Sequence, residues 1–295
     1  MILITGGTGF LGTHLATELI RRGHTVRCGS RTKRLRFSIE GTGQPELEQL
    51  DVEDEGSLLR AMRGVDTVVH LVGILTETKR EKFHTIHVKG TENVLRACRH
   101  SGIKRYIHIS ALGTRKNARS QYHRSKWQAE ELVRGSGLEF TVFRPSVIFG
   151  KGDRFTTLLA RVLKLFPLVM VPCSGKNRMQ PLYVRDLVAA ISSSIERTDA
   201  IGKTFEIGGR DVLTFDEIVD EIARVLKRKA LKIHMPMGVV RLGATVMEYL
   251  LPSPPLTRDA LLMLEEDDIT AQNALTEFFR IEPTPFRDGL KEYLC

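Results

Sequence analysis

The chain has few cysteines, one tryptophan and no long hydrophobic run, and these shortages exclude several classes of protein. Its four cysteines, Cys28, Cys98, Cys173 and Cys295, are far apart and form no C-x-x-C pair. Neither a disulfide framework nor a metal cluster is therefore expected, and a reducing compartment is indicated. No run reaches the about 18 uninterrupted apolar residues of a membrane-spanning helix. An apolar strand begins at residue 2 and leaves no room ahead of it for a leader peptide, so we expect a cytoplasmic protein.

The most apolar stretch lies late in the chain, at residues 235–251. Arg241 and Glu248 interrupt it, which makes it too polar for a membrane span. Burial of this stretch against the rest of the protein is the simpler interpretation. A helix that lies on a membrane surface or on a partner is the alternative.

Acidic residues are in deficit, because 44 Lys and Arg against 35 Asp and Glu give a net charge of +9. Such a balance suits nucleic acid, an anionic membrane or an acidic ligand. No helix-turn-helix, zinc or RNP-type pattern accompanies the charge, so nucleic acid is not expected as a partner. Most of the excess charge is expected on the solvated surface. It is densest at Arg27, Arg31, Lys33, Arg34 and Arg36, and again at Arg115, Lys116, Arg119 and Arg124.

A glycine-rich turn follows the first apolar run directly. Residues 5–12 read Thr-Gly-Gly-Thr-Gly-Phe-Leu-Gly, and an amphipathic helix is expected to leave from them. Glycines let the backbone approach a pyrophosphate, and a helix N-terminus supplies N–H groups and partial positive charge. The string fits both G-x-G-x-x-G, from Gly7, and G-x-x-G-x-x-G, from Gly6. The strand before it and the helix after it predict a dinucleotide-binding turn.

The first half of the chain alternates short apolar runs with segments of helical periodicity. This alternation is typical of right-handed βαβ units and predicts an α/β fold with a doubly wound parallel Rossmann sheet. We expect a dinucleotide-binding core over residues 1–152. A smaller, mixed α/β substrate-side lobe is expected over residues 153–295, interleaved with the last strands of the sheet. Strands are predicted at 2–5, 25–29, 46–50, 67–72, 105–110 and 139–143, and helices at 12–22, 55–62, 82–101, 122–135, 185–197, 215–227 and 237–250.

Tyr122 and Lys126 are spaced to share one face of a helix. A nearby ammonium lowers the pKa of a tyrosine, so that the phenolate can act as acid or base near neutral pH. The lysine can also bind the hydroxyls of a nicotinamide ribose. The pair follows the predicted strand that ends at Ser110, where the Rossmann order puts a catalytic helix. We therefore predict that both side chains face the cofactor.

Other polar side chains of this region are expected to have structural roles. Glu130 and Glu131 are expected to form a solvated helix face, and Trp127 is expected to pack. No metal site is predicted, because metal-ligand spacing is lacking among the histidines His84, His87, His100 and His108.

The end of the second predicted strand bears on the choice of cofactor. A NAD site usually places Asp or Glu there for the ribose 2′-hydroxyl, whereas a 2′-phosphate needs arginine. This chain has Ser30 and Arg31 with no acid, and an arginine can bind a phosphate through two parallel hydrogen bonds. NADP(H) is therefore predicted over NAD(H). The alternative is an Arg31 that only faces solvent.

With these motifs, the chain resembles the short-chain dehydrogenase/reductase superfamily, in its extended or atypical branch, over nearly its whole length. Residues 109–113, 122–130, 205–209 and 213–218 look most like bacterial relatives of the Rossmann-type nucleotide-binding accessory subunit of respiratory complex I. The chain departs from many catalytic members at Ala111, where they carry a hydroxyl.

The resemblance implies a catalytic set of Ser110, Tyr122 and Lys126, and it favours the glycine register that starts at Gly6. It also implies a nucleotide held by the glycine turn, by the ends of the strands and by a segment beside the nicotinamide. These residues are Gly6, Thr8, Gly9, Phe10, Leu11, Gly12, Ser30, Arg31, Asp51, Val52, Leu71, Val72, Gly73, Ile109, Tyr122, Lys126, Pro145 and Ile148.

We therefore expect an enzyme, an NADP(H)-binding oxidoreductase that acts on a carbonyl or hydroxyl of a small, quinone-related or other substrate. Two alternatives stay open. One is a non-catalytic or sensing NADPH-binding subunit of a complex-I-like assembly, and the other is a nucleotide-sugar epimerase or dehydratase. The resemblance also implies peripheral association with a membrane or a respiratory complex, and homodimers are common among its members.

Overall fold

The computed structural model describes residues 1–295 except 33, 40–42, 173, 252–253 and 255, so Lys33 and Cys173 lie outside the described residues. Two compact units make up the chain. Unit 1 consists of Met1–Arg144 and Leu187–Phe205, and unit 2 of Pro145–Asp186 and Glu206–Cys295. Each unit is therefore built from two segments that are separated in the sequence.

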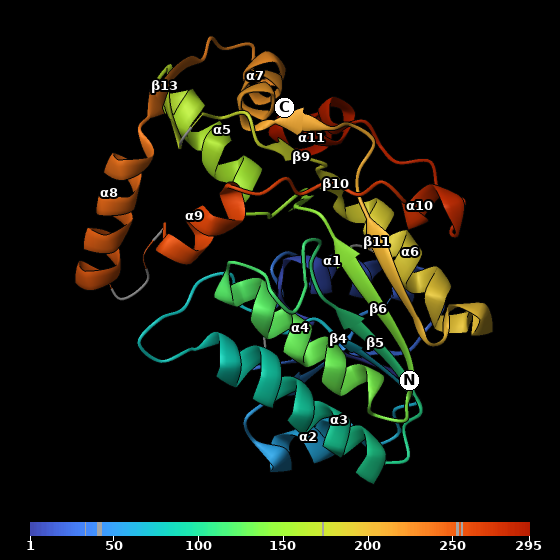
Figure 1. Ribbon diagram of the computed structural model, residues 1–295. Coiled ribbons are helices and arrows are strands. Elements are labelled where there is room, and N and C mark those ends of the chain that lie inside the picture. The colour runs from blue at the N-terminus through green and yellow to red at the C-terminus, as the bar shows by residue number, and fades with distance from the viewer. Residues whose placement is uncertain (33, 40–42, 173, 252–253, 255) are drawn as a thin grey trace. The chain divides into compact units, whose positions relative to one another are not determined.

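A seven-stranded sheet forms the centre of unit 1 (Figure 1). Its order is β11-β6-β5-β4-β1-β2-β3, and every pair from β3 to β6 is parallel. The chain therefore winds outward from β1 in both directions, which confirms the predicted doubly wound α/β sheet. The strands are β1 (Ile2–Thr5), β2 (Val26–Ser30), β3 (Glu46–Gln49), β4 (Thr67–His70), β5 (Arg105–Ile109), β6 (Glu139–Pro145) and β11 (Lys203–Ile207).

Helices cover both faces of this sheet (Figure 1). The helices α2 (Glu55–Ala61), α3 (Gly90–His100) and α4 (Gln121–Arg134) lie on one face, and α1 (Phe10–Arg21) and α6 (Val184–Glu196) on the other. The helix predicted at 82–101 starts as a π-helical turn, η1 (His84–Lys89), before it continues as α3. Such turns are rare and are frequent at functional sites. A short 3₁₀ turn, η2 (Thr198–Ala200), precedes β11.

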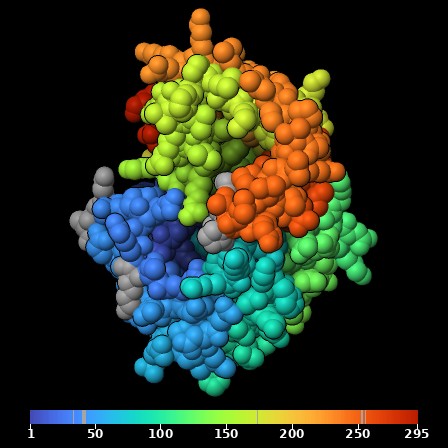
Figure 2. Space-filling model, turned by 90° about the vertical axis from the view of Figure 1, so that its left-hand side faces the viewer, coloured from blue at the N-terminus to red at the C-terminus, as the bar shows by residue number. Residues whose placement is uncertain are grey.

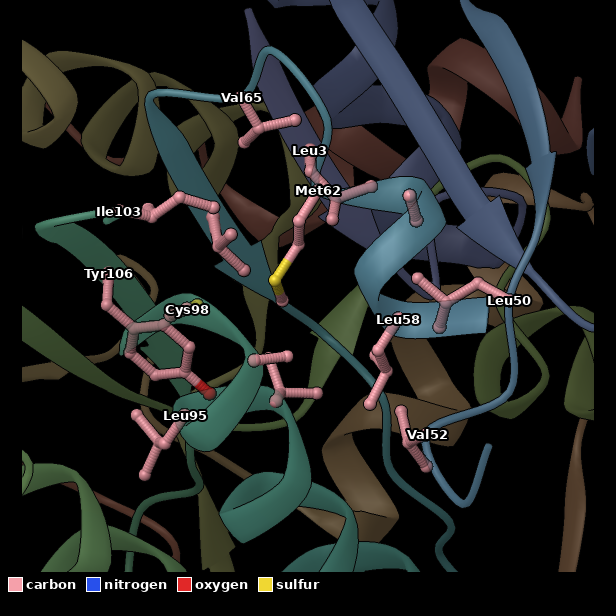
Figure 3. Close-up of a cluster of buried hydrophobic side chains, with 14 of the residues drawn as sticks. Leu3, Leu50, Val52, Leu58, Met62, Val65, Leu95, Cys98, Ile103 and Tyr106 are labelled. Carbon is pink, nitrogen blue, oxygen red and sulfur yellow. The ribbon is translucent and has the colours of Figure 1, made fainter. Parts of the chain in front are cut away.

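One hydrophobic cluster of the unit 1 core lies between the sheet and the α2–α3 face (Figure 3). Leu3 comes from β1, Leu58 from α2, Leu95 from α3 and Tyr106 from β5, and all four side chains are at most 2% exposed. Burial of one aliphatic side chain of this size contributes about 1.5–3 kcal/mol to stability. The central strands β1 and β4 are buried at every residue because helices cover both faces of the sheet.

Unit 2 is a mixed arrangement of short strand pairs and helices. The pairs are β7 (Ile148–Phe149) with β10 (Leu182–Tyr183), β8 (Leu168–Pro172) with β13 (Leu231–Met235), and β9 (Arg178–Met179) with β12 (Leu213–Thr214). The β9–β12 pair is antiparallel, whereas the other two are parallel. The helices are α5 (Phe155–Leu165), α7 (Phe215–Val225), α8 (Met237–Leu250), α9 (Arg258–Leu264), α10 (Ala274–Glu277) and α11 (Phe286–Leu294).

The burial expected for residues 235–251 is wrong for one side of the helix they form. Val240 and Ala244 of α8 are buried, but Leu242 is 67% and Tyr249 is 85% exposed. In the part of the chain that the structure describes, no helix is long and apolar enough to span a bilayer.

Candidate functional site

The glycine turn joins β1 to α1 so tightly that a side chain is excluded at Gly6, Gly7 and Gly12. Gly6 has a φ of +75°, in the left-handed region. A Cβ on Gly7 would lie 2.8 Å from the Cα of Cys28 in β2, and one on Gly12 would lie 2.5 Å from the carbonyl oxygen of Gly6. Gly9 caps α1 without a side-chain hydrogen bond. The turn is a backbone cradle at a helix N-terminus, and this form fits a pyrophosphate.

The register chosen from the sequence leaves out Gly7, which the structure encloses as tightly as Gly12. Its N–H lies 3.1 Å from the Ile4 oxygen and 3.2 Å from the Gly29 oxygen, between β1 and β2. The G-x-G spacing that it shares with Gly9 is the feature of the sequence that marks it.

The end of β2 faces the glycine turn through hydroxyl groups. Thr8 Oγ1 donates to Ser30 Oγ at 2.8 Å, and Ser30 Oγ donates to the Thr32 carbonyl at 2.5 Å. Arg31 follows with a side chain that is 61% exposed, and its Nη1 lies 2.6 Å from Glu81 Oε1. The sequence places no acid beside Arg31, but the fold brings Glu81 there from a distant loop. A phosphate at Arg31 would have to compete with this carboxylate.

The strand ends beside the turn are held by backbone bonds. Leu71 N–H donates to the Thr5 carbonyl at 3.0 Å, and a Cβ on Gly6 would lie 3.3 Å from the Val72 nitrogen. The β4 end therefore lies against the glycine turn. Asp51 lies after β3, and its carboxylate accepts the Glu53 N–H at 3.0 Å.

Val52, the neighbour of Asp51, is buried against α3. A Cβ on Gly90 at the start of α3 would lie 2.9 Å from Val52 Cγ2, and the Asn93 amide donates to the Val52 carbonyl at 2.9 Å. This contact fixes the position at which the 51–52 segment leaves the sheet.

Tyr122 and Lys126 lie one turn apart on the buried side of α4, which Ser120 caps. Lys126 Nζ donates to the carbonyl oxygen of Ile109, the last residue of β5, at 3.0 Å. The same Nζ lies 3.1 Å from the place that a Cβ on Gly73 would take, so glycine is what lets this loop reach the ammonium. Burial lowers the pKa of Lys126 to about 8, although the charge of Glu130 opposes the shift. The structure thus brings Lys126, Gly73 and Ile109 together, and their contact with a cofactor stays a prediction.

His87 belongs to this site, although sequence reasoning gives it a structural role. Its Nε2 accepts the Ile74 N–H at 3.0 Å, and its Nδ1 lies 2.8 Å from Ser125 Oγ. Ser125 Oγ donates its proton to the Tyr122 carbonyl. A lone pair of the Ser125 oxygen therefore accepts from His87, whose Nδ1 carries the proton. Burial and then the charge of Lys126 lower the pKa of His87 to about 2, which keeps the ring neutral. The ring therefore links the loop after β4 to α4, edge to face with Tyr122 at 5.5 Å.

Two more neutral histidines lie in the strands below the site. His70 Nδ1 lies 2.7 Å from Thr5 Oγ1, and burial lowers its pKa to about 3. Burial also lowers the pKa of His108, whose ring stacks on His70 at 5.6 Å. Among the described residues, no group of three or more His, Cys, Asp and Glu side chains is placed to bind a metal ion.

Ser110 and Thr114 form a pair of buried hydroxyls directly after β5. Ser110 Oγ donates to Thr114 Oγ1 at 3.3 Å, and Ser110 N–H donates to the Phe143 carbonyl at 2.7 Å. Ala111 has no hydroxyl, but Thr114 places one beside Ser110 from the following turn. The four-residue spacing was the only sequence feature that could have indicated it.

The solvated face expected for Glu130 is wrong, whereas Glu131 is exposed as expected. The Glu130 side chain is 0% exposed, and Arg144 of β6 lies 2.7 Å from its Oε2. Arg134 binds the same carboxylate at 2.5 Å. Both guanidinium groups also lie over the Trp127 ring, at 5.2 Å for Arg134 and 6.0 Å for Arg144. This cluster ties α4, and with it Tyr122 and Lys126, to the sheet.

Pro145 and Ile148 belong to unit 2. Pro145 ends β6, and Ile148 pairs with Leu182 between β7 and β10. Ser146 lies between them, and its Oγ donates to the Asp268 carboxylate at 2.6 Å. Contact of Pro145 and Ile148 with a nicotinamide stays a prediction.

Comparison with known proteins identifies relatives of several kinds. The profile of the NAD dependent epimerase/dehydratase family matches residues 2–208. "NADH dehydrogenase [ubiquinone] 1 alpha subcomplex subunit 9, mitochondrial" of Arabidopsis thaliana is 29% identical over 92% of this chain and 71% of its own length. "Ceramide reductase" of Caulobacter vibrioides is 30% identical over 83% of this chain and 77% of its own length.

A solved structure shares the fold at low sequence identity. "MoeE5 in complex with UDP-glucose and NAD" superposes with a TM-score of 0.78 at 19% identity, over 99% of this chain and 97% of the other. The predicted resemblance to the extended short-chain dehydrogenase/reductase branch and to the complex I subunit is confirmed by these matches.

Proposed function

The chain belongs to the NAD dependent epimerase/dehydratase family, and from this premise we propose an NADP(H)-binding oxidoreductase of the short-chain type that acts on a carbonyl or hydroxyl group. The observation that carries the proposal is the buried ammonium of Lys126, 3.0 Å from the Ile109 carbonyl and one helical turn from Tyr122. A buried lysine with a lowered pKa beside a tyrosine is typical of a tuned acid–base pair.

The residues fit a dinucleotide. A Cβ on Gly7 or Gly12 would collide with neighbouring backbone, so glycine keeps the turn tight where the N-terminus of α1 begins. We propose that the groups that hold the nucleotide are the turn residues Gly6, Thr8, Gly9, Phe10, Leu11 and Gly12, with Ser30, Arg31, Asp51, Val52, Leu71, Val72, Gly73, Ile109, Pro145 and Ile148.

The bound nucleotide supplies or accepts the hydride. Tyr122 transfers a proton to or from the reacting oxygen of the substrate, and the positive charge of Lys126 favours the phenolate. Ser110 orients the same oxygen, with Thr114 as its hydrogen-bond partner. Because His87 is neutral and its Nε2 accepts the Ile74 N–H, it holds the loop over the site and takes no part in proton transfer. Most of the rate gain comes from placement of the reacting groups.

The preference for NADP(H) rests on Arg31 and on the lack of an acid at the end of β2. Fluorescence titrations with NADPH and NADH test it. We expect NADPH to bind more tightly than NADH, and Arg31→Ala to weaken NADPH about tenfold while it leaves NADH unchanged, because a charged hydrogen bond to phosphate is lost. Equal or tighter binding of NADH, with no effect of Arg31→Ala, would refute the preference.

A second candidate is a subunit that binds NADPH without turnover in a complex-I-like assembly at a membrane. The relative named as a complex I subunit and the loss of the hydroxyl at Ala111 favour it. Mass spectrometry of the nucleotide that co-purifies, followed by assays with quinones and carbonyls, separates the candidates. Bound NADPH without turnover on any substrate favours the subunit.

Two further parts of the proposal depend on the family alone. A nucleotide-sugar epimerase or dehydratase, which uses the cofactor transiently, is the third candidate, and UDP-sugar conversion in the same assays identifies it. Peripheral membrane association and a homodimer are the expected states of the protein, and light scattering on the purified chain measures the second.

A further inference from the structure

Unit 2 exposes an apolar face that its own core does not use. On the two-stranded sheet, Leu168 and Met170 of β8 stand beside Leu231 and Ile233 of β13, in register. All four side chains are exposed, by 41% to 69%, whereas Val169 and Val171 between them are buried. The outer surface of this small sheet is therefore built from aliphatic side chains where an exposed strand pair normally carries polar ones.

The helix that follows β13 continues this pattern. Val239, Leu242, Val246 and Tyr249 of α8 fall on one stripe at helical spacing, and each is at least 47% exposed. The opposite stripe packs Val240 and Ala244 against Leu261 of α9. Figure 2 shows α8 (orange) and α5 (lime) on the same face of unit 2. We call the exposed apolar side chains of β8, β13 and α8 the apolar face.

The two sequence segments that contain β8, β13 and most of α8 are rich in positive charge. Residues 154–185 carry six Lys and Arg, residues 222–247 carry six more, and neither segment contains an Asp or Glu, although the whole chain has 35 of them. Lys164, Lys227, Arg228 and Lys229 are exposed. Other cations of these segments pair with acids from elsewhere in unit 2, as Lys232 does with Asp220 and Arg241 with Glu265. The complement of an apolar surface with exposed cations beside it is apolar within and negatively charged at its edge.

From this pairing of an apolar stripe with exposed lysines and arginines we infer that the apolar face binds the surface of an anionic lipid bilayer. The aliphatic side chains of α8 enter the boundary between headgroups and acyl chains, and the lysines and arginines bind lipid phosphates. A second copy of the chain is a poorer occupant, because a two-fold contact would bring the same positive segments together. The inference does not depend on the nucleotide site or on its chemistry.

Vesicle co-sedimentation of the full chain tests the inference, with phosphatidylcholine vesicles compared with vesicles of phosphatidylcholine and roughly one-third phosphatidylglycerol. We expect binding to the anionic vesicles, weak binding to the neutral ones, and release at high salt because screening weakens the lysine–phosphate attraction. The double variant Leu242→Asp/Val246→Asp should bind at least about tenfold more weakly, since two apolar anchors are lost and negative charge is added.

Matched controls separate the apolar face from general surface effects. Val212→Asp changes another exposed apolar residue of unit 2 and should bind like the wild type. Lys229→Glu should weaken binding, whereas Lys104→Glu, an exposed lysine of unit 1, should not. Unchanged NADPH binding and circular dichroism in each variant show that it is folded.

Three results would overturn the inference. They are equal binding to neutral and anionic vesicles, full binding by Leu242→Asp/Val246→Asp, and no binding to either kind of vesicle. If the chain then forms a dimer that this double variant dissociates, the apolar face belongs to a contact between protein chains. Because all variants keep the nucleotide site, none of these results bears on whether the protein is an oxidoreductase.

Discussion

The ammonium of Lys126 donates a 3.0 Å hydrogen bond to the carbonyl oxygen of Ile109, so the central helix of the candidate site is anchored to the end of the neighbouring strand β5. The bond is made inside the protein, where the lysine is 5% exposed. A buried charge of this kind is costly, and its position beside Tyr122 and Gly73 supports the proposed role of Lys126 in chemistry or nucleotide binding.

The lowered pKa of Lys126 predicts how stability depends on pH. Its pKa falls from 10.5 to about 8 on folding, so the unfolded chain binds more protons between these values and stability rises with pH there. Relative to Lys126→Met, the free energy of unfolding of the wild type should increase by about 3 kcal/mol from pH 8 to pH 10.5. Urea unfolding of both proteins across this range measures it, and a flat difference would contradict the burial of a charged lysine.

Tyr122→Phe should abolish turnover while NADPH binding stays nearly unchanged. The phenol ring packs between Phe83 and His87, and phenylalanine keeps that packing. Loss of the proton donor should lower kcat by at least about 100-fold. Tyr249→Phe is the control, because Tyr249 is 85% exposed on α8. Turnover that survives in Tyr122→Phe would assign the proton transfer to another group.

Removal of the Glu81 carboxylate should strengthen NADPH binding. Glu81→Gln keeps the shape of the side chain but releases Arg31 from the 2.6 Å ion pair. The freed guanidinium should bind a 2′-phosphate several-fold more tightly, and NADH should gain nothing. Parallel titrations with both nucleotides measure the difference. A gain for both would mean that Glu81 acts on a part of the cofactor that they share.

Adjacent glutamates on α4 should differ sharply in their effect on stability. Glu130→Ala leaves Arg134 and Arg144 without their buried carboxylate and should cost about 3–5 kcal/mol in the free energy of unfolding. Glu131→Ala removes a half-exposed partner of Arg134 and should stay within about 0.5 kcal/mol. Denaturant titration of the two variants compares them directly. Similar losses in the free energy of unfolding would show that the buried ion pairs stabilise the protein no more than the exposed one.

Gly12→Ala should disrupt the glycine turn, because the added Cβ would lie 2.5 Å from the Gly6 carbonyl oxygen. We expect loss of nucleotide binding and a lower Tm. Gly243→Ala, in the middle of α8, meets nothing within 4 Å and should raise stability by about 0.5–1 kcal/mol through helix propensity. Nucleotide titration and thermal unfolding of both variants decide whether the effect belongs to the site or to glycine replacement in general.

Regular elements of the fold were predictable where local periodicity is strong. The bounds of β1 and α8 agree with the prediction, and β2 to β6 differ from it mainly at their ends, whereas no strand was predicted at β11. The π-helical turn η1 and the strand pair β8–β13 were not predicted. The first depends on which carbonyl each N–H selects, and the second joins segments about 60 residues apart, so neither leaves a periodic pattern in the sequence.

The candidate site, like the fold, was predictable only in the features that depend on residues close in sequence. Spacing placed Tyr122 and Lys126 on one helix face, and glycine spacing marked the turn. The contacts of Glu81 with Arg31 and of His87 with Ser125 could not be predicted, because they form only when distant loops and helices pack together. Glu130 was assigned to solvent, since its burial depends on Arg144 arriving from β6.

The order of amino acids alone established the sheet-and-helix alternation, the glycine turn and the tyrosine–lysine pair, because each depends on residues close along the chain. Tertiary packing decided which charges are buried, which acids meet which arginines, and which side of α8 is left exposed. These outcomes depend on desolvation and on contacts between segments that the chain brings together only by folding.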